Sequence, residues 1–125
     1  MVSGVLEVTI VEGRSLKNCD FFGENDAYVE VYTEKKYKQR TRTIKNSNNP
    51  VWNEQLRFNI HKGDHTIHFD VYDADLIGRD TIGKCKIRLK HVFDDGEFDQ
   101  WIKLPAHFGL SSRGEIHVIM SFTVS

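Results

Sequence analysis

Five aspartates stand in two short segments of the chain, and carboxylates gathered in this way can bind a metal ion. Asp20 and Asp26 lie in CDFFGEND, and Asp73, Asp75 and Asp80 lie in DADLIGRD. If the two segments meet in space, the charges repel one another unless they take up protons or bind a cation. A single aspartate in a loop usually only shapes a turn. Five of them, flanked by apolar residues, favour a metal site.

Calcium is the cation that best matches this donor set, because it binds about six to eight oxygen atoms and accepts both carboxylates and backbone carbonyls. Zinc prefers histidine and cysteine, and the six histidines of the chain show no ligand spacing. An EF-hand loop starting at Asp73 is excluded, because Ile77 stands at a ligand position and Lys84 stands where a bidentate glutamate is needed.

Alternation of apolar and polar residues predicts the strands that must position these segments. The alternation is clear in five segments, namely 6–10, 56–60, 67–71, 85–89 and 116–124. Three more segments are rich in β-branched and aromatic residues, namely 28–33, 36–44 and 98–104. Only residues 89–96 could form a short helix. Eight short strands predict an all-β antiparallel sandwich, in which the two acidic segments can meet at one end.

The composition indicates a single domain, residues 1–125, without bulk attraction for nucleic acid or membranes. The formal net charge of −1 means that any electrostatic function depends on how the charges are distributed. No apolar run reaches the roughly 20 residues of a membrane span, and the N-terminal segment does not resemble a signal peptide. Cys19 and Cys85 lack metal-ligand spacing, which is typical of reduced thiols in a cytosolic protein.

Three motifs, in order along the chain, resemble the C2 domain family. The segment LKNCDFFGENDAYVEV is similar to the family's first calcium loop, NSNNPVWNEQLRF to its Asn-Pro-x-Trp-Asn-Glu segment, and VYDADLIGRDTIG to its third loop. The resemblance runs from about Val5 to Val124 and extends to small single-C2 proteins of the plant elicitor-responsive type. It implies an eight-stranded antiparallel β-sandwich with the family's circularly permuted (type II) topology.

The resemblance also implies a calcium site. The ligands would be the side chains of the five aspartates together with the backbone carbonyls of Cys19 and Ala74. The third loop is one residue shorter than the commonest form between Asp75 and Asp80, which leaves the number of bound ions open. Ala27 replaces the usual proline of the first loop, a change that affects only the stiffness of the loop exit.

Apolar residues at the tips of both acidic segments suggest insertion into a membrane. Phe21 and Phe22 stand between the aspartates of the first segment, and Leu76 and Ile77 stand between those of the second. Large apolar side chains are usually buried in a folded protein. We therefore expect these four residues to face lipid while the aspartates face calcium, although Phe22 could instead fold back onto the sandwich.

A basic segment, KKYKQRTRTIK, offers a second contact with lipid. Four basic side chains share one face of the predicted strand by alternation, namely Lys36, Lys38, Arg40 and Arg42. They could be a solvated strand edge, or they could contact anionic head groups, at about 1 kcal/mol for each cation. Some members of the family carry lysines where this chain has Glu30 and Tyr32. The sequence therefore leaves open whether the chain has a dedicated phosphoinositide pocket.

The sequence and the resemblance together predict a membrane-targeting module rather than an enzyme. The chain has no glycine-rich phosphate loop, no GxSxG motif and no zinc motif, and its aromatic spacing matches no nucleic-acid platform. The expected function is calcium-dependent, reversible binding of a cytoplasmic monomer to anionic phospholipids such as phosphatidylserine. The alternative is a calcium-independent C2 domain that binds other proteins.

Overall fold

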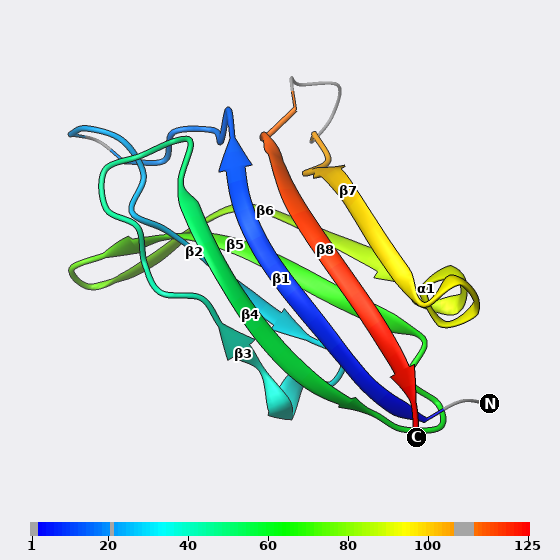
Figure 1. The fold of residues 1–125 in the computed structure, drawn as a ribbon. Coiled ribbons are helices and arrows are strands. Elements are labelled where there is room, and N and C mark those ends of the chain that lie inside the picture. The colour runs from blue at the N-terminus through cyan, green and yellow to red at the C-terminus, as the bar shows by residue number, and fades with distance from the viewer. Residues whose placement is uncertain (1–2, 21, 107–111) are drawn as a thin grey trace.

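The computed structural model describes residues 3–20, 22–106 and 112–125 and shows two packed antiparallel sheets (Figure 1). One sheet has the strand order β4-β1-β8-β7, and the other has the order β3-β2-β5-β6. The elements are β1 (Gly4–Arg14), β2 (Ala27–Tyr32), the 3-10 helix η1 (Lys35–Tyr37), β3 (Gln39–Arg40), β4 (Val51–Ile60), β5 (Thr66–Asp75), β6 (Gly78–Arg88), α1 (Lys90–Asp95), β7 (Glu97–Lys103) and β8 (Glu115–Val124). The predicted eight-stranded sandwich is confirmed within the described residues, and the permuted topology stays a prediction.

The core lies between the sheets and follows from the alternation in the sequence. Leu6, Val8 and Ile10 of β1 are fully buried, while the residues between them are half-buried on the outer face. Fully burying such a side chain contributes about 1.5–3 kcal/mol. Trp52 of β4 is also fully buried, and its indole N–H donates a hydrogen bond of 3.1 Å to the carbonyl of Ala27. This bond ties an edge of one sheet to the start of β2 in the other.

The basic segment differs from the strand predicted across residues 36–44. The 3-10 helix η1 occupies its beginning, and β3 contains only two residues. Thr41 is 1% exposed, and its N–H donates to the carbonyl of Val29 at 3.0 Å while its hydroxyl accepts from the N–H of Val29 at 3.0 Å. A side chain that bonds to the neighbouring backbone in this way replaces part of a strand ladder. The prediction of a long strand was therefore wrong.

The second acidic segment is a tight hairpin rather than an irregular loop. β5 continues to Asp75 and β6 begins at Gly78, with these two residues paired and Asp73 paired with Asp80. Leu76 and Ile77 form the turn. The register shifts once, because Val71 pairs with Gly83 whereas Tyr72 pairs with Thr81. Such a bulge changes the direction of the side chains that follow it and is common beside functional sites.

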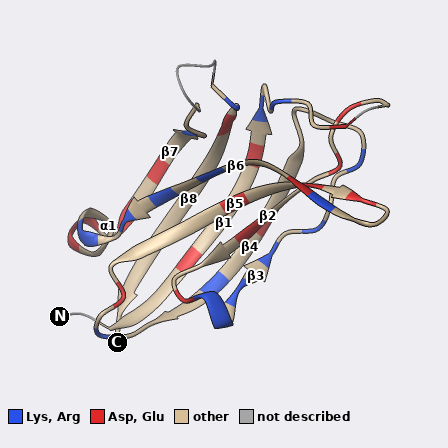
Figure 2. Ribbon diagram, turned by 180° about the vertical axis from the view of Figure 1, so that it is seen from behind, with Lys and Arg blue, Asp and Glu red and all other residues tan. Residues whose placement is uncertain are grey.

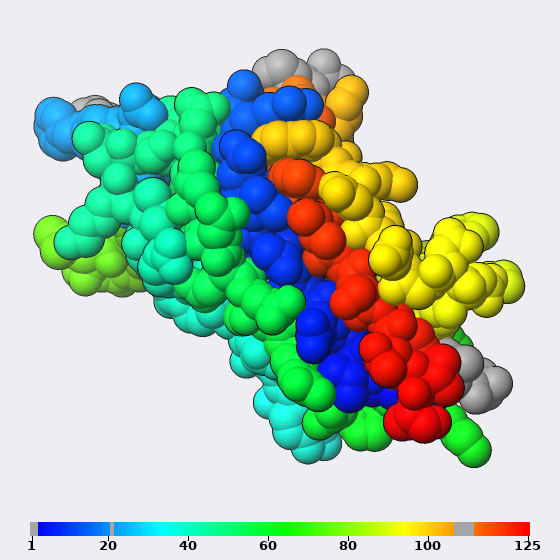
Figure 3. Space-filling model, viewed as in Figure 1, coloured from blue at the N-terminus to red at the C-terminus, as the bar shows by residue number. Residues whose placement is uncertain are grey.

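Loop 1 (residues 15–26) and the hairpin tip (residues 75–78) project from one side of the sandwich. They appear as separate light-blue and yellow-green projections in Figure 3. The start of β1 and the end of β8 lie together, far from both projections, and the N–H of Ser125 donates to the carbonyl of Ser3 at 3.1 Å. The short helix expected in residues 89–96 is present as α1. Among the described residues no helix has the length and hydropathy required to cross a membrane.

Candidate metal centre

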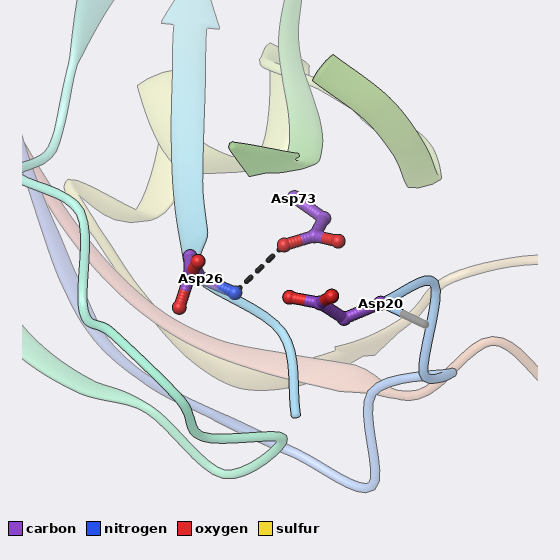
Figure 4. Close-up of side chains that lie close together, drawn as sticks. All are labelled: Asp20, Asp26 and Asp73. Atoms are coloured by element: carbon purple, nitrogen blue, oxygen red, sulfur yellow. Dashed lines mark hydrogen bonds between the residues drawn. The ribbon is translucent and has the colours of Figure 1, made fainter. Parts of the chain in front are cut away.

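Three aspartates converge between loop 1 and β5 (Figure 4). One carboxylate oxygen from each of Asp20, Asp26 and Asp73 lies within 4.8 Å of the others. The backbone N–H of Asp26 also donates to Oδ1 of Asp73 at 2.7 Å, so the two acidic segments meet as predicted. Two unit charges at about 4.8 Å repel by roughly 3–4 kcal/mol at an effective dielectric constant of about 20. A bound divalent cation would attract each carboxylate and so offset this repulsion.

Asp73 is the buried member of the group, with 1% of its surface exposed. It continues the inward row of Phe69 and Val71 along β5, which places its carboxylate where the core opens to the loops. Burial raises the pKa of the Asp73 carboxyl, and the charges of the neighbouring aspartates raise it further, against the opposing hydrogen bond from the N–H of Asp26. In the absence of a cation, the negative charge of the site therefore destabilises the folded protein.

Asp75 and Asp80 lie outside the group of three but interact with it. Asp80 is paired with Asp73 across the hairpin, and Asp75 lies two residues further along β5. A hydrogen bond with Asp80 raises the pKa of Asp75, as do the negative charges of Asp80, Asp20 and Asp26. The neighbouring negative charges therefore act on Asp75, and the role of Asp75 and Asp80 as metal ligands stays a prediction.

Asn25 holds loop 1 in shape, a role that the sequence reasoning missed. Its side chain is fully buried, and its amide donates to the carbonyl of Lys17 at 2.9 Å and to Oδ1 of Asn48 at 2.7 Å. Its own Oδ1 accepts from the N–H of Cys19 at 3.0 Å. These bonds tie the backbone that precedes Asp20, at Lys17 and Cys19, to Asn25 in the later part of the loop. That the carbonyl of Cys19 is a calcium ligand stays a prediction.

The turn formed by residues 45–49 supports the same site from outside. The N–H of Asn46 donates to Oδ1 of Asp26 at 2.7 Å, and Oδ1 of Asn46 accepts from the N–H of Glu24 at 2.9 Å. Asn46 has a φ of 53°, a left-handed conformation that asparagine tolerates better than most residues. The N–H of Ala74 donates to the carbonyl of Asp26 at 2.8 Å. The asparagine-rich segment NSNN was the signal in the sequence for this supporting turn. That the carbonyl of Ala74 is a calcium ligand stays a prediction.

The apolar residues at the two tips are exposed. The exposed fractions are 86% for Phe22, 104% for Leu76 and 100% for Ile77, so Phe22 does not fold back onto the sandwich. Phe21, the fourth predicted insertion residue, lies outside the described residues. Gly23, with a φ of 93°, supplies the left-handed turn that follows Phe22. Exposed apolar side chains therefore stand in both projections that carry the aspartates.

Two of the predicted basic residues lie over the outer face of the β3-β2-β5-β6 sheet. Lys38 contacts Oε1 of Glu30 at 3.3 Å, and the guanidinium of Arg40 lies 3.6 Å from the centre of the Tyr28 ring. Arg79 also contacts Glu30, at 2.8 Å. Burial alone would raise the pKa of Glu30, but hydrogen bonds from Arg79 and Lys38 lower it. Part of the positive charge on this face is thus neutralised within the protein.

The other two basic residues point elsewhere, so the expectation of a single basic face holds only in part. Arg42 contacts Oε1 of Glu54 at 3.1 Å and donates to the carbonyl of Trp52 at 2.7 Å, both on β4. Lys36 belongs to η1, and its ammonium lies 5.4 Å from the centre of the Tyr37 ring. The break in the predicted strand explains the difference, because alternation cannot align side chains across a 3-10 turn.

The fold is that of a β-sandwich that carries an acidic cluster and exposed apolar residues on loops at one end. The family model of the C2 domain matches residues 4–104, and the chain therefore belongs to the C2 domain family. Domains of this fold are typically binding modules without catalytic activity, which agrees with the prediction that the chain is not an enzyme.

Several curated plant proteins are similar in sequence. Synaptotagmin-4 of Arabidopsis thaliana is 38% identical over 106 residues, which is 83% of this chain and 19% of that protein. The 16 kDa phloem protein 1 of Arabidopsis thaliana is 31% identical over 106 residues, or 77% of this chain and 65% of that protein. A calcium-dependent lipid-binding protein of Arabidopsis thaliana is 31% identical over 90 residues, or 71% of this chain and 18% of that protein. The chain thus spans only a small part of the longer relatives.

Solved structures confirm the fold. A C2 domain of plant Extended Synaptotagmin 1 superposes with a TM-score of 0.86 at 22% identity, over 100% of this chain and 98% of that one. A C2 domain-containing protein from a gene described as elicitor-responsive superposes with a TM-score of 0.77 at 26% identity, over 99% of this chain and 91% of that one. This second structure agrees with the predicted likeness to single-C2 proteins of the elicitor-responsive type.

Proposed function

We propose that this C2 domain binds anionic phospholipid membranes when calcium is bound among its five aspartates. The observation that carries the proposal is the juxtaposition of the acidic group with exposed apolar tips. Carboxylates of Asp20, Asp26 and Asp73 gather within 4.8 Å, and fully exposed Leu76 and Ile77 stand on the hairpin that carries Asp73. A site built only for stability would not combine uncompensated charge with exposed apolar surface.

The donor set fits calcium. All the acidic donors are oxygen atoms, and they come from two separate segments, which suits the irregular coordination sphere that calcium accepts and magnesium does not. Bound calcium supplies positive charge that offsets the repulsion among the carboxylates and between the carboxylates and lipid phosphates. The protein contributes the fixed position of Asp73 at the opening of the core and the hydrogen-bonded frame of Asn25 around loop 1.

The apolar tips supply the second part of the binding energy. Complete burial of one large apolar side chain contributes about 1.5–3 kcal/mol, and partial immersion contributes less. Phe22, Leu76 and Ile77 are all exposed and stand in the two projections that carry the aspartates. Neither this contribution nor the electrostatic one anchors a protein tightly by itself, because stable anchoring generally needs two signals. Their combination gives reversible binding that depends on calcium.

Anionic lipids such as phosphatidylserine are the proposed partners, with the domain acting as a cytoplasmic monomer. The name of the relative described as a calcium-dependent lipid-binding protein supports this choice. Lys38 and Arg40 lie on one sheet face and could contact head groups, but Glu30 neutralises part of the charge there. We therefore assign the basic segment a general attraction to anionic lipid, smaller than four unpaired cations would give.

Calcium titration of the isolated domain tests the proposed metal site. Calorimetry should detect binding to the wild type, and Asp75→Asn should weaken it by about tenfold or more, because calcium affinity follows the number of charged ligands. Asp95→Asn, on the exposed end of α1, is the matched control and should bind as the wild type does. Equal affinities for the wild type and Asp75→Asn would remove Asp75 from the site.

A further inference from the structure

A second cationic region lies on β6 and β7, apart from the basic segment. Basic residues recur along β6 and around η1 and β3 (Figure 2). Part of the charge near β3 is neutralised, since Lys38 contacts Glu30 and Arg42 contacts Glu54. Arg79 of β6 also contacts Glu30. The lysines further along β6 and on β7 form a separate group.

A hollow of about 400 Å³ opens where the edge strand β6 of one sheet approaches the edge strand β7 of the other. Its basic residues are Lys84 and Lys86 of β6 and Lys103 of β7. Its wall includes Ile102 of β7 and the ring of Tyr32 at the end of β2. A concave site with an apolar wall and a few convergent charges is the usual form of a small-ligand site.

The three lysines have little internal competition for an anion. Among the described residues, neither Lys86 nor Lys103 has a carboxylate within 4.0 Å, and Lys84 lies 3.9 Å from Asp70. Asp70 is itself buried, with 3% of its surface exposed, and it accepts hydrogen bonds from the hydroxyls of Tyr32 at 3.2 Å and Tyr72 at 3.5 Å. Asp70, the one carboxylate among the described residues that line the hollow, therefore contacts only Lys84 of the three lysines within 4.0 Å.

The remaining titratable groups of the hollow add no negative charge near neutral pH. Burial raises the pKa of the Cys85 thiol to about 12, with a further contribution from Asp70. Burial and the Asp70 charge also raise the pKa of Tyr32 to about 12, so its hydroxyl stays a donor. Burial lowers the pKa of His68, whose ring stacks on Tyr32 with 4.8 Å between ring centres. Apart from Asp70, the charges in the hollow are therefore those of the three lysines.

We propose that this hollow binds a phosphomonoester independently of calcium, through the ammonium groups of Lys84, Lys86 and Lys103. A phosphomonoester carries a charge of about −1.5 to −2 near neutral pH and has three acceptor oxygens, whereas a diester carries a single charge. The volume of about 400 Å³ exceeds the space that a phosphate group alone needs. The apolar wall at Ile102 accommodates the body to which the phosphate is attached.

The hollow is remote from the tips of loop 1 and the hairpin. Asp70 precedes Asp75 by five positions on β5, which corresponds to roughly 17 Å along an extended strand. A domain standing on its apolar tips would hold the hollow away from the bilayer surface. The phosphomonoester is therefore either a free small molecule or the head group of a lipid that the domain reaches when it tilts.

Titration with phenyl phosphate, followed by NMR in excess chelator, tests the site. Saturable shifts should concentrate on residues of β5, β6 and β7, and diphenyl phosphate should bind more weakly. The double variant Lys86→Glu with Lys103→Glu should lose affinity by about tenfold or more. The control Arg57→Glu with Lys62→Glu makes the same change of charge at exposed positions of β4 and of the turn that follows it, and it should bind as the wild type does. Equal losses in both variants, or shifts spread over all basic residues, would overturn the proposal.

Vesicles distinguish the two sources of the ligand. In chelator, vesicles of phosphatidylcholine with phosphatidic acid, whose head group is a phosphomonoester, should retain the wild type more than the double lysine variant if the source is a lipid. Saturable phenyl phosphate binding without vesicle binding supports the free ligand. Absence of both contradicts the proposal and leaves the calcium-dependent function untouched, because no calcium is present in either experiment.

Discussion

Replacing Leu76 and Ile77 together by alanine removes apolar surface only at the hairpin tip. Both side chains are fully exposed, so the change creates no cavity and the fold should be unaffected. Each substitution removes roughly three methylene-sized groups at about 0.8 kcal/mol each when fully buried. Complete immersion would make the loss about 5 kcal/mol, and half immersion about 2.4 kcal/mol. Since 1.4 kcal/mol is a factor of about ten, half immersion predicts that membrane affinity falls roughly 50-fold.

Binding to vesicles that contain phosphatidylserine, measured at saturating calcium, is the assay for this prediction. Calorimetry should show that the double variant still binds calcium as the wild type does, because the aspartates are unchanged. Val124→Ala is the matched control, since Val124 is 63% exposed and lies at the C-terminal end of β8, near the chain ends. An unchanged vesicle affinity in the hairpin variant, or an equal loss in the control, would refute insertion of the hairpin.

Two further predictions concern the calcium-free protein. Because folding raises the pKa of Asp73 above its ordinary value of 3.8, stability falls as the pH rises through the interval between the two pKa values. Asp73→Asn should therefore raise the melting temperature near neutral pH, and the gain should disappear below about pH 3.8; a gain that is the same at every pH would point to another cause. Asn25→Ala removes the fully buried amide that bonds to the N–H of Cys19, the carbonyl of Lys17 and Oδ1 of Asn48, and it should lower the free energy of unfolding by about 2–4 kcal/mol in denaturant titrations. A loss within experimental error would show that water replaces the amide.

The strands could be predicted because one face of each sheet is buried. A period of two places Leu6, Val8 and Ile10 in the core, and no other register buries them together. The meeting of Asp26 with Asp73 could be predicted for the same reason, since antiparallel strands return their connections to the same end. These features depend on patterns that repeat along the sequence.

The features that were not predicted depend on single side chains bonded to distant backbone. Thr41 replaces strand pairing with bonds to Val29, which ends β3 early and separates Arg42 from Lys38. In the sequence Asn25 cannot be distinguished from any other asparagine in a turn. Only the folded chain shows that its side chain is buried. The hairpin was not predicted because polar residues interrupt the alternation after Val71. The expected strand therefore ended there, whereas β5 continues to Asp75.

Co-sedimentation with phosphatidylserine vesicles, in calcium and in excess chelator, tests the central claim most directly. The acidic group should repel the anionic surface when it is empty and should allow the apolar tips to insert when calcium is bound. We predict that most of the protein sediments with the vesicles in calcium, stays in the supernatant in chelator, and returns to the supernatant when chelator is added to the calcium sample. Equal sedimentation under the two conditions would contradict calcium-dependent membrane binding.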